Sequence, residues 1–227
     1  MTLSTFSCSC SALSAAGAND VFMKILITAG PTREFIDPVR FITNSSSGQM
    51  GYAIAAEALR RGHEVILVSG PVHIAPPAGA EVVDVVTAAD MAEAVKSRFA
   101  SCDCCIMSAA VADYRPAKVC EQKMKKTPGN LAIELERTED ILKTIGTMKK
   151  ESQLLIGFAA ESENLLENAA GKLQRKNLDW IIANKLSDGF AKSTNACVVL
   201  GKNGEKIPFD TRPKTELAGA LLDLFNI

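Results

Sequence analysis

The sequence lacks an excess of positive charge. Its 227 residues include 25 lysines and arginines against 26 aspartates and glutamates, and the formal net charge at pH 7 is −1. A protein that binds nucleic acid or an anionic membrane through a general basic surface has a clear surplus of positive charge. The charge balance therefore argues against both partners, and any bound anion must be held by a local cluster of donors and cations.

Long apolar runs and a basic amino terminus are also missing. No segment approaches the roughly 20 apolar residues that a membrane helix needs. The first 22 residues are small and polar, and they lack the basic start of a signal peptide. We interpret residues 1–22 as a disordered leader and residues 23–227 as a single domain that opens at Met23. The expected location is the cytoplasm.

Histidines and paired cysteines are scarce. The two histidines, His63 and His73, fall near a predicted helix end and in a proline-rich loop, and each is expected at the surface. Cysteines 102, 104 and 105 crowd one stretch without a CxxC pair or a nearby histidine, which indicates reduced thiols rather than a zinc site. Lysine, aspartate and asparagine side chains must therefore carry any chemistry.

Three common motifs are absent. No GxGxxG follows the first predicted strand, so ordinary dinucleotide binding is unsupported. There is no GxxxxGK[ST] for a P-loop enzyme and no GxSxG elbow for a hydrolase.

What the sequence does contain is a regular alternation of short apolar runs and amphipathic segments. The apolar runs predict buried strands, and the 3.6-residue spacing of apolar positions predicts helices. We expect strands over residues 24–28, 64–68, 81–86, 104–108, 131–136, 154–159, 179–183, 197–200 and 205–209, and helices over residues 48–61, 88–99, 138–149, 162–176 and 215–225. Thr138 is the expected cap of the third helix.

This order of elements predicts an α/β, Rossmann-like fold. The sheet should be mostly parallel, with helices on both faces and a small late β-hairpin around Asn203-Gly204. In such sheets ligands bind beyond the carboxyl ends of the strands. The loops that follow those ends are therefore the places to search for a site.

The loop after the first strand, residues 29–47, is much longer than the usual connection of about 2 to 6 residues. Gly30 breaks the strand, and Ser46–Gly48 leads into a helix with free backbone N–H groups, which favours phosphate binding. Taken alone, these serines favour a plain helix cap. Arg40 and Asn44, with a second arginine at 33, shift the balance toward an anion site.

A second long loop covers residues 109–126. Ala109 and Ala110 leave room for a ligand at a strand end, and Asp113 could accept hydrogen bonds from a ribose or a base. Lys123 belongs to a lysine cluster that is either a solvated charge run or part of the site.

Three further residues follow or flank another strand end. Phe158 could stack on a base, although a core aromatic is the alternative. Lys172 and Lys176 lie one helical turn apart and share a face, as a phosphate clamp or as a solvated stripe.

Taken together, several of these segments resemble one family. The segments TAGPTRE, DPVRFITNSSSGQMG, AAVADYRP, KMKK, GFAAE and KNLDWIIAN are similar, in consistent order from residue 24 to 227, to the phosphopantothenate–cysteine ligases. The resemblance implies a Rossmann-like homodimer that uses Mg²⁺ in coenzyme A biosynthesis. The substrate carboxylate would attack the α-phosphate of a nucleotide, and the cysteine amine would then attack the acyl-nucleotidylate.

The resemblance also assigns roles to residues. Asn44 and Lys123 would be catalytic, and Arg40 and Ala110 would bind the substrate. The nucleotide would be bound by Gly30, Ser46, Ser47, Gly48, Ala109, Asp113, Lys123, Phe158, Lys172 and Lys176. Metal ligands are not identified. Ser45 and Gln49 stand where related bacterial sequences often carry His and Lys, so a phosphate contact at Gln49 would be neutral.

The spelling AAVADYRP with KMKK resembles the branch of the family that uses CTP, so CTP is expected over ATP. The resemblance also raises a separate flavin-dependent decarboxylase as a candidate partner, because in many bacteria the ligase is fused to such an enzyme. Two other functions stay open on the residues alone. One is a short-chain-type NAD(P)-dependent reductase, although Pro116 interrupts the only Tyr-x-x-x-Lys spacing, Tyr114 to Lys118. The other is a non-catalytic nucleotide-binding protein.

Overall fold

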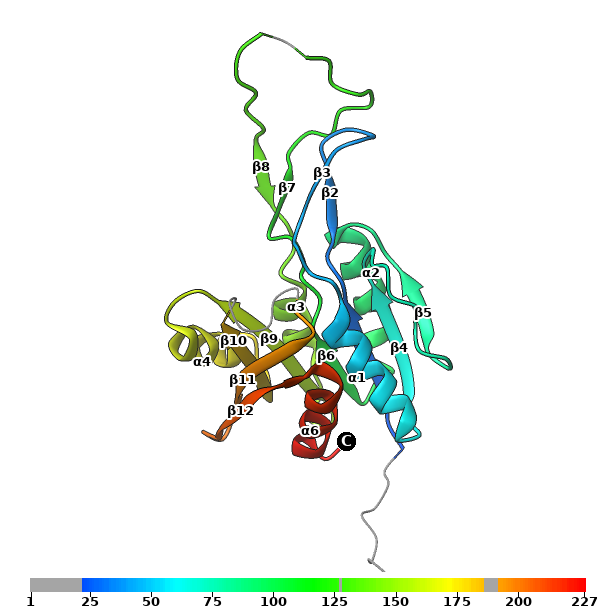
Figure 1. The fold of residues 1–227 in the computed structure, drawn as a ribbon, viewed down its shortest axis with the longest axis vertical. Coiled ribbons are helices and arrows are strands. Elements are labelled where there is room, and N and C mark those ends of the chain that lie inside the picture. The colour runs from blue at the N-terminus through cyan, green and yellow to red at the C-terminus, as the bar shows by residue number, and fades with distance from the viewer. Residues whose placement is uncertain (1–21, 127, 186–191) are drawn as a thin grey trace, which may run out of the picture.

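An eight-stranded sheet forms the centre of the molecule (Figure 1). The structure, a computed structural model, describes residues 22–126, 128–185 and 192–227, so the leader predicted for residues 1–22 lies outside it except for Phe22. The strands of the sheet are β1 (Lys24–Ala29), β4 (Glu64–Ser69), β5 (Glu81–Asp84), β6 (Cys104–Met107), β9 (Leu154–Glu161), β10 (Trp180–Lys185), β11 (Thr194–Gly201) and β12 (Lys206–Pro213).

The strand order is β12-β11-β10-β9-β6-β1-β4-β5. From β1 the chain moves outward to β4 and β5, then crosses to the other side of β1 and continues through β6, β9 and β10, all in parallel. The late hairpin β11–β12 adds the only antiparallel pairs of this sheet among the described residues. The predicted fold class is confirmed, and the crossing between β1 and β6 opens a crevice at the carboxyl ends of the strands.

Helices cover both faces of the sheet. Because successive strand residues point to opposite faces, Ile25 and Ile27 pack in one apolar cluster and Leu26 packs in the other. The first cluster includes α1 (Gln49–Arg60) and α6 (Lys214–Phe225), and the second includes α2 (Ala88–Phe99), α3 (Ile141–Met148) and α4 (Leu165–Arg175). No helix of the described residues is long and apolar enough to cross a membrane.

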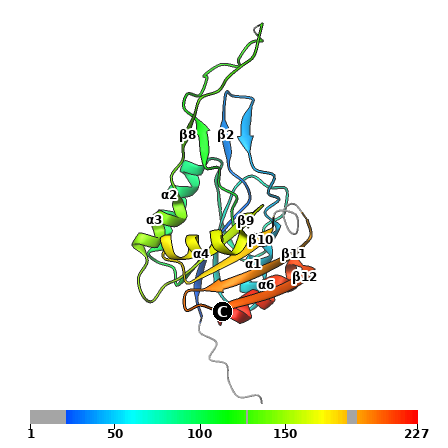
Figure 2. The same cartoon turned by 90° about the vertical axis from the view of Figure 1, so that its left-hand side faces the viewer.

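An arm projects from the carboxyl-end side of the sheet (Figures 1 and 2). We define the arm as residues 33–43 and 114–137, of which residue 127 is outside the described part. It contains two short antiparallel ribbons, β2 (Arg33–Phe35) with β3 (Phe41–Thr43) and β7 (Tyr114–Pro116) with β8 (Leu135–Arg137). The remainder of the described chain is called the body.

Asp37 holds the two ribbons of the arm together. Its carboxylate, which is inaccessible to solvent, accepts the backbone N–H groups of Val39 (2.9 Å), Arg40 (2.8 Å) and Met124 (3.1 Å) and forms an ion pair with the Arg40 guanidinium. The Arg40 guanidinium holds the pKa of Asp37 well below its usual range. Arg40 Nη2 also donates to Met124 O (3.0 Å), so the tips of the two ribbons are tied at this point.

Three sequence predictions are corrected by the structure. The strand expected over 131–136 is limited to β8, whose side chains are all exposed. The third helix is capped by Asp140, which accepts the Lys143 N–H (3.1 Å), and not by Thr138, which donates to Ala112 O (2.6 Å) instead. His63 is only 9% exposed, because its Nδ1 accepts the Met23 N–H (3.3 Å) where the first strand begins.

Candidate functional site

A cavity of about 340 Å³ lies beyond the carboxyl ends of β1, β6, β9 and β10. Its size falls in the range of small-molecule sites. Most of the residues predicted to bind the nucleotide line it, together with Ala110 from the predicted substrate set. These lining residues are Ser46, Ser47, Gly48, Ala109, Ala110, Asp113, Phe158, Lys172 and Lys176. The strand-end rule therefore located the cavity from the sequence.

The start of α1 forms one wall of the cavity. Gly48 adopts the left-handed conformation (φ 78°), and no side chain caps the helix by a hydrogen bond. Its first turn contains no acidic residue, and the Gly48 N–H donates to Ser46 Oγ (3.3 Å). Uncapped N–H groups and the positive end of the helix dipole therefore face the cavity, as the binding of an anion requires.

Gly51 allows this helix start to lie close to the strand ends. A Cβ placed on Gly51 would come within 2.6 Å of both Ala29 Cβ and Ser108 Oγ. Real Cβ atoms do not approach other atoms so closely, so only glycine fits while the helix rests on β1 and the end of β6. Gly30 also allows close packing at this point. It lies against Gly48 and Gly70, beneath the helix start, and it does not line the cavity.

The floor of the cavity is the segment that follows β6. Ser108 Oγ donates to Thr28 O (2.8 Å), and the Ala109 N–H donates to Thr28 Oγ1 (3.2 Å). Further along, the Ala110 N–H donates to Gly30 O (2.9 Å). These bonds fix the backbone that leads to Asp113, whose carboxylate is exposed at the cavity.

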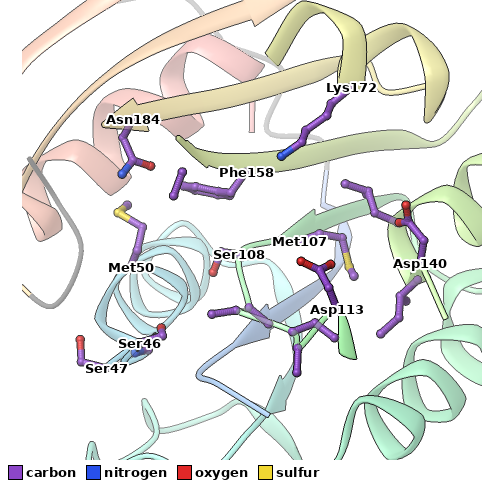
Figure 3. A pocket seen from close by; sticks show the side chains of 18 of the residues that line it. Ser46, Ser47, Met50, Met107, Ser108, Asp113, Asp140, Phe158, Lys172 and Asn184 are labelled. Carbon is purple, nitrogen blue, oxygen red and sulfur yellow. Dashed lines mark hydrogen bonds between the residues drawn. The ribbon is translucent and has the colours of Figure 1, made fainter. Parts of the chain in front are cut away.

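Phe158 separates two ends of the cavity. In Figure 3, Asn184 and Met50 lie on one side of the Phe158 ring, and Asp113 and Asp140 lie on the other. The ring belongs to the last part of β9 and is half-buried. An aromatic face in this place can pack against a planar base.

The two predicted phosphate-binding lysines are already paired. Lys172 Nζ donates to Glu161 (2.6 Å), and Lys176 Nζ donates to Asp140 (2.9 Å). Burial alone would raise the pKa of Asp140, but the hydrogen bonds from Lys176 and from the Lys143 N–H, together with the charges of these two lysines, outweigh it and the pKa is lowered. The lysines therefore bring little uncompensated positive charge to that end of the cavity.

Asn44 lies directly behind the cavity floor. Its Nδ2 donates to Ala110 O (3.0 Å) and Val111 O (3.4 Å). It lines an adjacent hollow of about 420 Å³ that also borders Ser46 and Ser47. Asn44 thus links the body, the floor and the base of the arm.

The two other residues with predicted roles, Arg40 and Lys123, lie on the arm. Lys123 precedes Met124, which Asp37 and Arg40 hold at the joined tips of the ribbons, and its side chain is exposed. Neither side chain lines the cavity. Within one chain the structure therefore brings the predicted nucleotide residues together but does not bring Lys123 or Arg40 to them.

The lining residues that were not predicted include three polar ones at one end of the cavity, Asn184, Asn195 and Lys214. We call their end of the cavity the amide end. Asn184 ends the KNLDWIIAN segment and follows a strand end that was to be searched, so a signal existed for it. Asn195 lies near the start of β11, and Lys214 begins α6 directly after β12. Both strands are antiparallel, so the rule of carboxyl ends does not apply to them.

The chemistry of the site does not include a protein cage for a metal ion. The described residues contain no group of three or more His, Cys, Asp or Glu side chains that could hold one. Mg²⁺ often binds through one or two carboxylates and substrate phosphates. The described residues are therefore compatible with a Mg²⁺ ion that binds through one or two carboxylates and substrate phosphates.

Comparisons with known proteins agree on one family. The family model described as the DNA/pantothenate metabolism flavoprotein C-terminal domain matches residues 22–226. The chain is 48% identical over 202 residues to the coenzyme A biosynthesis bifunctional protein CoaBC of Bacillus subtilis, which covers 87% of this chain and 50% of that protein. It is 45% identical over 203 residues to a cysteine/cysteine sulfinic acid decarboxylase of an unknown prokaryotic organism, covering 88% and 56%.

A solved structure shares the fold. The crystal structure of the C-terminal domain of a coenzyme A biosynthesis bifunctional protein CoaBC matches with a TM-score of 0.79 and 48% identity, covering 92% of this chain and 97% of that one. The chain spans about half the length of the curated relatives it matches.

Proposed function

This chain belongs to the family of the DNA/pantothenate metabolism flavoprotein C-terminal domain, as its motifs predicted, and on that premise we propose that it is a phosphopantothenate–cysteine ligase. The name of the Bacillus subtilis relative supports a role in coenzyme A biosynthesis. Because the chain spans only about half of that relative, the name does not say which half performs which reaction. The geometry of the cavity has to carry the rest of the argument.

One observation carries the proposal: a single cavity joins an uncapped helix start, an exposed carboxylate and an aromatic ring. The start of α1 suits phosphates, Asp113 suits ribose hydroxyls, and Phe158 suits a base. These three surfaces match the three parts of a nucleotide. The hollow on the other side of Ser46 and Ser47, which Asn44 lines, is the adjoining space for the second substrate.

The proposed reaction has two steps. A carboxylate oxygen of phosphopantothenate attacks the α-phosphorus, the bond from that phosphorus to the bridging oxygen breaks, and the electron pair leaves with pyrophosphate. The cysteine amine then attacks the acyl carbon, loses a proton and expels the nucleoside monophosphate. Both steps build negative charge, so preorganised donors at the helix start and at Asn44 would stabilise them.

Asn44 is proposed to stabilise charge at the acyl group. Its Nδ2 already donates to Ala110 O and Val111 O beside the cavity. A bound acyl-nucleotidylate would take over one of these bonds. Gly30, in contrast, is proposed to act only through the position of the helix start, because it lies beneath Gly48.

The nucleotide is proposed to be CTP. The backbone groups near Ala109 and Ala110 are fixed by bonds to Thr28 and Gly30, and a rigid backbone edge can select a base by its hydrogen-bonding pattern. Mg²⁺ would enter with the triphosphate and neutralise part of its charge. The described residues provide no separate cage for it.

A homodimer is proposed to complete the site. Seven large apolar side chains of the arm are exposed to solvent, a pattern that marks an interaction surface. They are Val39, Phe41, Tyr114, Val119, Leu131, Ile133 and Leu135. A second copy would cover them and would also fix the position of Lys123 and Arg40 relative to a cavity.

The test is an assay of the purified chain with phosphopantothenate, L-cysteine, Mg²⁺ and either CTP or ATP. We expect pyrophosphate and phosphopantothenoylcysteine in equal amounts, with CTP preferred, as measured by a coupled pyrophosphate assay and mass spectrometry. Without cysteine, labelled pyrophosphate should still exchange into CTP when phosphopantothenate is present. Loss of cysteine without any nucleotide, with release of CO₂, would contradict the proposal and favour the reaction named for the decarboxylase relative.

A further inference from the structure

The two ends of the cavity differ in charge. On one side of Phe158, three acidic residues meet two lysines that are already paired with carboxylates. These residues are Asp113, Glu139, Asp140, Lys172 and Lys176. The amide end has one lysine, Lys214, and two asparagines, and no acidic residue of the described chain lines the cavity there. A polyanion is therefore favoured at the amide end.

Lys214 is a buried cation without a carboxylate partner in the described part of the chain. It is 8% exposed at the start of α6, and its Nζ donates to the carbonyl oxygen of Lys192. No ion pair connects it to a described Asp or Glu. Burial lowers its pKa below the usual range for lysine. A buried ammonium is costly unless an anion compensates it, so the geometry indicates that a ligand supplies that anion.

The two asparagines end rows of apolar side chains in the sheet. On the face covered by α1 and α6, Ile182 of β10 is followed by Asn184, and Cys197 of β11 is preceded by Asn195. β10 and β11 are neighbours, so both amides lie at the same edge of the sheet. The apolar core therefore stops at these amides, where the cavity begins.

Asn195 adds an independent observation. It is 4% exposed, and its Oδ1 has no hydrogen-bond partner. Buried polar atoms almost always have a partner, so the exception suggests that a ligand completes this amide. A half-turn of the amide would present its NH₂ group, which carries two donors, to an oxygen-rich ligand.

We infer that the amide end is the subsite for the β- and γ-phosphates of the nucleotide, with Lys214 as its charged phosphate-binding residue and Asn184 and Asn195 as amide donors. The inference rests on the proposed function, since it concerns the triphosphate of that reaction. The base and ribose then lie toward Phe158 and Asp113, and the reacting α-phosphate lies near the start of α1.

This placement gives Lys214 a role in the first step. When the bond between the α-phosphorus and the bridging oxygen breaks, the electron pair stays on the departing pyrophosphate. An ammonium held in a poorly solvated place stabilises that added charge more than a solvated one does. The lysines at 172 and 176 cannot do the same without losing their own carboxylate partners.

The test compares ligands with and without distal phosphates. The affinities of inorganic tripolyphosphate, CTP and CMP for the full chain are measured by titration calorimetry, with ATP and AMP in place of CTP and CMP if ATP is the co-substrate. In Lys214→Gln we expect tripolyphosphate and CTP to bind about tenfold or more weakly, because a charge-assisted bond is lost, and CMP to change less than about threefold. Lys150→Gln removes the same charge from an exposed residue that does not line the cavity, and it should change none of these affinities. An equal loss for CTP and CMP, or unchanged tripolyphosphate binding, overturns the inference.

A second variant keeps the inference testable if Lys214→Gln does not fold. Asn195→Asp keeps the shape of the side chain but adds a negative charge, and it should abolish tripolyphosphate binding while CMP still binds. Retained tripolyphosphate binding would overturn the subsite. These measurements separate failure of the subsite from failure of the proposed function. If both variants keep ligase activity and normal CTP binding, the subsite is wrong and the ligase assignment stands. If tripolyphosphate binding depends on Lys214 but the chain has no ligase activity, the ligase assignment is wrong and the subsite stands.

Discussion

The body and the arm use apolar side chains in opposite ways. In the body, rows such as Ile25 and Ile27 are completely buried between the sheet and its helices. On the arm, Leu131 is 58% exposed and Val119 is 53% exposed, and the ribbons have only three paired residues on each strand. The body therefore carries the stability of the chain, whereas the arm is held by the hydrogen bonds and ion pair of Asp37 and leaves its apolar side chains exposed.

The largest expected effect is a difference between the body and the arm in how much a truncated apolar side chain lowers the free energy of unfolding. Ile156→Ala in the body should lower the free energy of unfolding by about 2 to 5 kcal/mol, because it empties a fully buried place in the core. Leu131→Ala on the arm should change it by less than about 0.5 kcal/mol. Urea unfolding of dilute protein measures both. Equal losses would mean that the arm belongs to the folded core.

The second prediction concerns Asn44, at the junction of body and arm. Asn44→Asp should slow product formation by about two decades or more, because a positioned donor becomes an acceptor that repels the developing charge. Nucleotide affinity should be kept, since Asn44 lies behind the cavity floor and does not line it. Steady-state rates and CTP titration of the same preparation check both parts. Unchanged turnover would remove Asn44 from the mechanism.

The third prediction tests the arm alone. The double variant Leu131→Lys, Leu135→Lys places like charges on the exposed apolar surface, so self-association should weaken by about tenfold or more. Sedimentation velocity at several concentrations measures it. The matched control is Met148→Lys, at an exposed apolar side chain of the body. If the arm variant associates as strongly as the control, the arm is not the dimer surface.

The smallest expected effect is a pH dependence. In the body, hydrogen bonds from Arg60 and then Arg61 lower the pKa of Glu57 from 4.5 to about 2. The folded pKa lies below the unfolded one, so this stabilisation is present above about pH 4.5 and is lost as the pH falls toward 2. Because Arg60 is mostly exposed, the loss should be only about 1 kcal/mol. Unfolding free energies at pH 5 and pH 3 should therefore differ less in Glu57→Gln than in the parent.

The arm should respond to the same change of pH only locally. Arg40 lowers the pKa of Asp37 below that of an ordinary carboxyl, so protonation should loosen the tie between the ribbons only in strong acid. The Met124 N–H donates to Asp37, so its hydrogen exchange reports the loosening. Faster exchange of that amide in Asp37→Asn, with an unchanged global free energy of unfolding, is the expected outcome.

The body was predictable from the sequence and the arm was not. Strands such as 24–28 have an apolar centre that marks them as buried. The helix predicted over 88–99 has the bounds of α2, whose start is fixed by a capping box between Thr87 and Asp90. β2, β3, β7 and β8 have three residues each and are largely exposed, so no apolar alternation marks them. His63 was wrongly placed at the surface from its position near a predicted helix end, because a local pattern does not show its partner, Met23, 40 residues away.

The candidate site divides in the same way. Residues near the carboxyl ends of parallel strands, such as Ala109 after β6 and Phe158 within β9, were found because those ends meet at one edge of the sheet. Asn195 belongs to the start of β11 and Lys214 to the start of α6, directly after β12. Both reach that edge only through the antiparallel pairing of the hairpin. Their place depends on tertiary register, which local patterns do not contain.

The close approach of Gly51 has a consequence for the width of the cavity. The first turn of α1 can approach β1 and the end of β6 this closely because Gly51 has a hydrogen atom where any other residue has a Cβ. A methyl group there would act as a wedge under the helix and lift its N–H groups away from the floor. The cavity would then be wider and would suit a larger ligand, although no side chain that lines it had changed.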